Sequence, residues 1–108
     1  EAMAETLFAQ VRKNLVPGGL VVLIETLGTN ALSPAAPHPR LVEFYQILQS
    51  RHGLRQTAIS TDYRFASPAE AAEVLGFFFG NAMTQAVRAA NSAVVPEWTG
   101  AWFGPLSA

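Results

Sequence analysis

The chain has 108 residues, of which 50% are hydrophobic and 14% are charged, and its formal net charge is −1 at pH 7. This balance, without any basic run, argues against nucleic acid as a partner, and the absence of cysteine excludes disulfides, thiolate metal ligands and cysteine nucleophiles. No apolar run reaches the roughly 20 residues that a membrane helix needs, and no secretion-signal pattern is present, so we expect a cytoplasmic protein without membrane contact.

The first predicted elements are a helix and a strand joined by a tight turn. Residues 1–15 place apolar side chains at helical spacing. The turn Pro17-Gly18-Gly19 then permits a sharp reversal. The aliphatic run from Leu20 to Ile24 follows, and it is typical of a strand buried on both faces in a parallel sheet. We expect the chain to be organised around this strand, with Glu25 and Thr26 at its carboxyl end, where ligands collect in open α/β sheets.

A loop and a second helix are predicted next, and together they form an insertion at about residues 29–53. Residues 29–39 carry three prolines, which favour a loop. A helix is predicted from Pro39 to near Gly53. Its apolar face comprises Leu41, Phe44, Tyr45 and Leu48.

The last third of the chain predicts a strand, a helix and a final strand. Residues 55–65 alternate in part, as in a strand near a sheet edge. The segment Ser67-Pro68-Ala69-Glu70 is a capping box with proline at the first helical position, so a helix is predicted to begin there. We expect this helix to bend near Gly80 and then to resume. The segment Val94–Phe103, which contains a proline, predicts the last strand.

This order of elements resembles the C-terminal half of class I S-adenosylmethionine-dependent methyltransferases. In that family, a helix-to-strand turn similar to Leu15-Val16-Pro17-Gly18-Gly19 introduces the fifth strand. Three later segments resemble one bacterial branch of the family; they are Thr61-Asp62-Tyr63-Arg64-Phe65, Phe77-Phe78-Phe79-Gly80 and Val95-Pro96-Glu97-Trp98-Thr99-Gly100-Ala101-Trp102. The resemblance covers roughly residues 1–103.

The resemblance implies an α/β fold, namely a partial Rossmann-like methyltransferase sheet with flanking helices. The chain would supply strands five, seven and six in this spatial order, with the last strand antiparallel. The edge that the family's fourth strand covers would then be open, and an open edge is a template for pairing with another chain. Residues 1–108 would thus be a single partial domain. The mean hydropathy of +0.22, which is high for a free-standing domain of this size, agrees with this interpretation.

The methyl donor is not expected to bind this chain alone. The family holds S-adenosylmethionine with a glycine-rich loop after its first strand and an acidic residue at the end of its second. The sequence has neither, and its only glycine pair is the turn Gly18-Gly19. S-adenosylmethionine is therefore expected as the cofactor of a longer parent protein, and no residue of this chain is assigned to cofactor binding.

Six residues are candidates for binding a small-molecule methyl acceptor. Glu25 and Thr26 follow the organising strand, although a solvated strand end is the alternative. Asp62 and Tyr63 could supply a base or a hydrogen bond, although Asp more often serves as a turn or capping group. The other two candidates are aromatic residues with a polar group, and they are Tyr45 and Trp98. The remaining large aromatic residues could line an apolar substrate pocket, but such a cluster more often belongs to the core, where we expect them; they are Phe77, Phe78, Phe79 and Trp102.

No metal site and no catalytic residue are assigned. His38 and His52 are separated by a helix and lack companions at ligand spacing. His38 lies in the loop and could still take part in acid or base chemistry.

Two functions of different classes follow. The first is the substrate-side portion of a methyltransferase, inactive without the half that binds the cofactor. The alternative is a non-catalytic half-domain that self-associates as a homodimer or larger oligomer. A free-standing small-ligand binder would leave the order of motifs unexplained.

Overall fold

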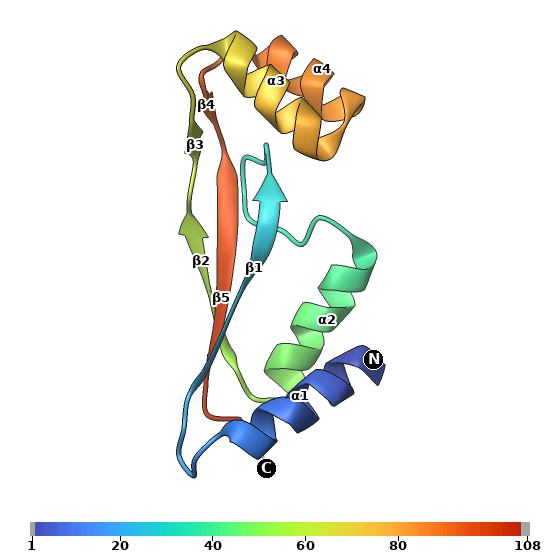
Figure 1. The fold of residues 1–108 in the computed structure, drawn as a ribbon, viewed down its shortest axis with the longest axis vertical. Helices are drawn as coiled ribbons and strands as arrows, with labels where there is room; N and C mark the ends of the chain where they lie inside the picture. Colours follow the sequence, from blue (N-terminus) through green and yellow to red (C-terminus); the bar gives the residue numbers. More distant parts are fainter. Residues whose placement is uncertain (1, 107–108) are drawn as a thin grey trace.

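The chain forms an elongated molecule with hydrophobic clusters near its two ends (Figure 1). The computed structural model describes residues 2–106. Its radius of gyration is 16.8 Å, whereas a compact domain of this length has a value of about 13 Å. The elements are α1 (Ala2–Asn14), β1 (Val21–Thr29), α2 (Pro39–Ser50), β2 (Arg55–Ser60), β3 (Tyr63–Arg64), α3 (Pro68–Phe79), α4 (Asn81–Ala90), β4 (Val94–Val95) and β5 (Glu97–Gly104).

The main sheet has three strands in the order β1-β5-β2. β5 is antiparallel to both neighbours, so β1 and β2 run parallel to each other. The short strands β3 and β4 form a second, two-stranded sheet. The prediction of a mixed α/β fold is confirmed, and the last long strand lies antiparallel between the other two.

Helices α1 and α2 lie together beside the lower part of the sheet and cover one of its faces (Figure 1). Trp102 in the central strand is fully buried there, and Gly100 provides the space for its ring, because a Cβ at Gly100 would overlap the indole. The buried residues of this cluster are Phe8, Leu27, Tyr45, Leu48, Leu54 and Trp102. Both Tyr45 and Leu48 belong to the predicted apolar face of α2, so this part of the prediction is confirmed.

The other face of the sheet carries exposed apolar side chains, which corrects the prediction that the organising strand is buried on both faces. Val22 and Ile24 of β1 are 62% and 59% exposed, because α1 and α2 both pack on the opposite side. A hollow of about 470 Å³ lies at the amino-terminal end of β1, next to this face. We call this face the open face, and it comprises Val22, Ile24, Thr26, Arg55, Thr57, Ile59, Thr99, Ala101 and Phe103.

The predicted start of the third helix is confirmed. Ser67 is the N-cap of α3, and its Oγ accepts a hydrogen bond from the Glu70 amide at 3.1 Å. Glu70 Oε1 in turn accepts from the Ala66 amide at 2.8 Å, one residue before the position used in a standard capping box. Two amides that precede or begin the helix are thereby satisfied.

The expected bend near Gly80 is a complete break between two helices. Gly80 has φ +94° and ψ −179°, which ends α3, and α4 then packs beside α3 (Figure 1). A Cβ at Gly76 would overlap Thr84, so this glycine permits the close approach of the two helices. The second hydrophobic cluster lies here and comprises Ala71, Ala72, Leu75, Val87 and Val95.

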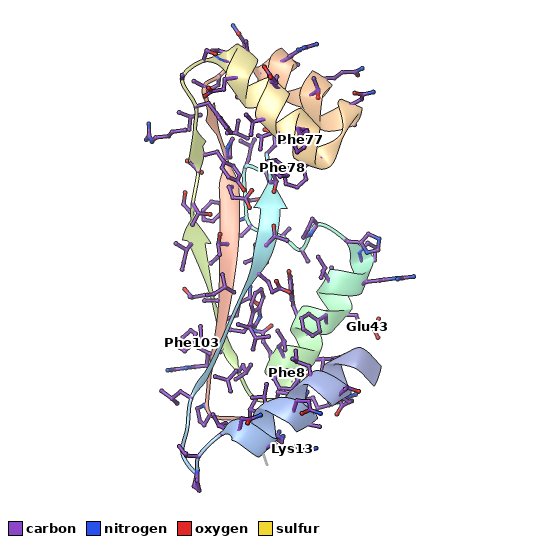
Figure 2. All side chains as sticks on the ribbon, viewed as in Figure 1. Phe8, Lys13, Glu43, Phe77, Phe78 and Phe103 are labelled. Carbon is purple, nitrogen blue, oxygen red and sulfur yellow. The ribbon has the colours of Figure 1, made fainter. Side chains whose placement is uncertain are left out.

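The three consecutive phenylalanines of α3 are not in the core, contrary to the prediction. Phe77, Phe78 and Phe79 are 83%, 70% and 50% exposed. The buried side of α3 is instead formed by Ala71, Ala72 and Leu75, against which α4 packs. Figure 2 shows Phe77 and Phe78 extending from α3 toward the side where β1 ends in this view.

Candidate functional site

The carboxyl ends of β1 and β2 lie at the same end of the sheet, where β5 begins (Figure 1). In parallel and mixed α/β sheets, this is the end at which ligands bind. The sequence had predicted Glu25 and Thr26 at the carboxyl end of the strand. β1 extends to Thr29, so both residues lie within the strand instead. They pair with Gly100 and Thr99, respectively.

Tyr45 joins α2 to the middle of β1. Its hydroxyl donates a hydrogen bond to the Thr26 carbonyl oxygen at 2.7 Å, and its ring lies 4.2 Å from that of Trp102, centroid to centroid. Burial, with a smaller effect from the Glu25 charge, raises the pKa of Tyr45 to about 12. Tyr45 therefore remains a hydrogen-bond donor near neutral pH and fixes α2 on the sheet.

Glu25 and Thr26 are both partly buried and lie on opposite faces of β1. The Thr26 hydroxyl accepts a hydrogen bond from the Gly28 amide at 3.1 Å. Glu25 shares the covered face with Leu27 and influences the pKa of Tyr45. The structure thus places Glu25 on the same side of β1 as Tyr45, whereas Thr26 meets Tyr45 only through its backbone carbonyl oxygen.

Asp62 and Tyr63 form a second group beyond the end of β2. Asp62 Oδ1 accepts hydrogen bonds from the Glu97 amide at 3.1 Å and from the Ser60 hydroxyl at 3.3 Å, so this carboxylate links β2 to the first residue of β5. Tyr63 lies in β3, opposite Val95. Burial, followed by the Glu97 charge, raises the pKa of Tyr63.

Glu97 is the residue at this end of the sheet that the sequence analysis did not identify. Its side chain is buried, and its Oε1 atom has no hydrogen-bond partner among the described residues. The signal in the sequence was weak, since it consists of one acidic residue after a proline at the start of an otherwise uncharged strand. Trp98, the next residue, is partly buried and packs against the first hydrophobic cluster.

The two groups are close along β5. The first group pairs with Thr99 and Gly100, and the second is bonded to Glu97. These attachment points are two to three residues apart, or about 7–10 Å along a strand. Trp98 lies between them in the register.

The glycine pair Gly18-Gly19 forms a tight turn before β1. It lies at the amino end of β1, opposite the candidate site. The Gly19 amide donates to the Val16 carbonyl oxygen at 2.9 Å, and a Cβ at Gly19 would come within 2.9 Å of the same oxygen. The turn is thus closed on itself.

Residues 2–106 contain neither a metal-ligand cluster nor a membrane-spanning helix. No set of three or more His, Asp or Glu side chains in this range could hold a metal ion. Within the same range, no helix has both the length and the apolar character needed to cross a bilayer. The chain matches no protein-family model, and no curated protein or solved structure shows significant similarity to it.

We predict that the stability of the fold falls as the pH decreases below about 6.5, because of His52. This side chain is 4% exposed, stacks on Phe8 at 3.9 Å between ring centroids, and its burial lowers its pKa. The unfolded chain takes up the proton first, so acid favours unfolding between the ordinary pKa of 6.5 and the lowered value of the folded state. Urea unfolding at a series of pH values from about 7.5 to 5 measures how the free energy of unfolding changes with pH.

His38 is not buried as His52 is, so it provides the control. His52→Phe should flatten the profile in this window, whereas His38→Gln, in an exposed position, should keep the slope. Glu5 should not contribute to the pH dependence between pH 7.5 and 5, because its hydrogen bond to Arg51 lowers the pKa of Glu5 below the ordinary 4.5. An unchanged slope in His52→Phe would contradict the assignment.

Proposed function

We propose that the chain is the acceptor-side portion of an S-adenosylmethionine-dependent methyltransferase that acts on a small molecule, and that it is inactive alone. The observation that supports this most is the sheet order β1-β5-β2, with β5 antiparallel between two parallel strands. This is the arrangement that the resemblance implies for the family's strands five, seven and six.

The uncovered surfaces support the same proposal. Among the described strands, β1 pairs only with β5, so its other edge is free. The open face carries large apolar side chains, and the molecule is less compact than a complete domain of its length. In a doubly wound sheet, further strands and helices cover such an edge and such a face.

In this proposal the chain holds the acceptor, and the missing half binds the donor. The candidate acceptor-binding residues remain Glu25, Thr26, Tyr45, Asp62, Tyr63 and Trp98. Catalysis by a methyltransferase depends largely on holding the two reactants in line, which is a positioning task. The chain's own residues would fix the position and orientation of the acceptor at the carboxyl ends of β1 and β2.

A transfer assay tests this function. The full product of the gene is incubated with methyl-labelled S-adenosylmethionine and a small-molecule extract of its source cells, with residues 1–108 alone as the control. We expect label in small molecules with the full product and none with residues 1–108. Absence of transfer by the full product, or equal transfer by both, would contradict the proposal.

Self-association is the second candidate function, and the open face together with the free edge of β1 favours it. It describes residues 1–108 on their own, where no other described residue covers these surfaces. The two proposals are compatible, because the surface that would contact the rest of a methyltransferase is also available to a second copy.

A further inference from the structure

Glu97 has a buried carboxylate, one oxygen of which has no partner among the described residues. The residue is 8% exposed, and Oε1 has no hydrogen-bond partner among residues 2–106. Burying a charged group without a partner is strongly unfavourable, so proteins pair such groups with donors or cations. An unpaired carboxylate at the ligand-binding end of a sheet therefore indicates a partner that comes from outside the described chain.

The backbone around Glu97 is held firmly. Its amide donates to Asp62 Oδ1 at 3.1 Å, and its carbonyl oxygen accepts from the Thr61 amide at 2.9 Å. The Pro96 carbonyl oxygen, directly before it, accepts from the Asn30 amide at 2.7 Å. Two other segments of the chain, at residues 61–62 and at Asn30, thus fix the position of this residue, as a binding site requires.

The groups near Glu97 favour a cation as its partner. Asp62 provides a second carboxylate, and no ion pair of the described residues involves either acid. Tyr63 pairs with Val95, two residues before Glu97, and burial followed by the Glu97 charge raises the pKa of Tyr63. The partly exposed Tyr63 ring offers an aromatic surface. A metal ion is disfavoured, because no group of three ligands is present in residues 2–106. An organic ammonium group beside an aromatic ring fits these features better.

We propose that Glu97 binds the amino group of the methyl acceptor, so that the substrate class is small amines with an apolar or aromatic body. The identification of this ligand as an acceptor rests on the proposed methyltransferase function. The binding site itself does not, since it is built from residues 61–63 and 96–97 of this chain.

Three probes of similar size and different charge test the site on residues 1–108. Benzylamine, benzyl alcohol and benzoate are each titrated at pH 7 while backbone amide NMR signals are recorded. We expect benzylamine to shift the amides of Glu97, Asp62 and Tyr63 in a saturable manner. The alcohol and the carboxylate should bind more weakly by roughly tenfold or more, the scale of one charge-assisted hydrogen bond. Equal responses to all three probes, or no response to the amine, would overturn the proposal.

Two matched variants sharpen the test. Glu97→Gln keeps the shape and should weaken benzylamine binding by roughly tenfold or more. Glu73→Gln makes the same chemical change at an exposed position of α3 and should leave binding unchanged. Undiminished binding in Glu97→Gln would overturn the assignment, and if that variant does not fold, the three-probe comparison on the native chain decides.

The two proposals fail separately. If the full gene product transfers methyl groups but benzylamine does not bind, the site at Glu97 is wrong and the function stands. If benzylamine binds through Glu97 but no methyl transfer occurs, the site stands and the function is wrong.

Discussion

Trp102→Ala is expected to destabilise the fold by about 3–5 kcal/mol, the usual cost of removing a large aromatic side chain from a core. Trp102 is fully buried in the central strand, and its ring lies against Tyr45 and over Gly100. A domain of this size has only about 5–15 kcal/mol of stability, so this variant should be largely unfolded or close to it. Urea unfolding followed by circular dichroism measures the loss.

Trp102→Phe is the matched control. The indole Nε1 has no hydrogen-bond partner among the described residues, so phenylalanine removes an unsatisfied group while keeping a ring. We expect this variant to lose clearly less stability than the alanine variant. A Trp102→Ala protein within about 1 kcal/mol of the native chain would show that the first hydrophobic cluster is not organised around this side chain.

Residues 1–108 alone should form a dimer or larger oligomer through the open face or the free edge of β1. Val22, Ile24 and Ile59 are exposed on this face, and burying each large aliphatic side chain contributes about 1.5–3 kcal/mol. A twofold contact is the simplest closed arrangement. Light scattering at micromolar concentration should give at least twice the chain mass of 11.6 kDa.

A charge on the open face should abolish this association. Ile24→Lys is expected to give a monomer, because it would bury a charged group at the contact. Val42→Lys changes a partly exposed valine on α2, away from the open face, and should leave the oligomer intact. A native chain that is monomeric, or an equal effect of both variants, would exclude association through this face.

Local signals in the sequence predicted the elements well. Ser67 and Glu70 make the helix start at Pro68 visible, because both hydrogen bonds of the cap are local. The spacing of Tyr45 and Leu48 likewise identifies the face of α2 that packs on the sheet. His38 is a partial exception, since its Nδ1 accepts from the Arg40 amide at 3.1 Å and caps α2, where the sequence suggested acid or base chemistry.

Burial was predicted less well, for a physical reason. Ile24 and Phe78 are apolar in the sequence but exposed in the structure. An apolar side chain is selected for burial in the complete protein or complex. In our proposal, the part that covers these side chains lies outside this chain, so they are exposed here. Glu97 was missed for a different reason. It stands out only because its Oε1 atom has no hydrogen-bond partner among the described residues, and a periodic sequence pattern does not contain that information.

Binding of the methyl donor tests the central claim most directly. S-adenosylmethionine is titrated calorimetrically into residues 1–108 and into the full product of the gene. We predict no measurable binding to residues 1–108, because Gly18-Gly19 forms a closed turn and no acidic partner for the ribose is present, and binding to the full product. Micromolar affinity for residues 1–108, or no binding to the full product, would contradict the assignment of this chain as the acceptor side of a methyltransferase.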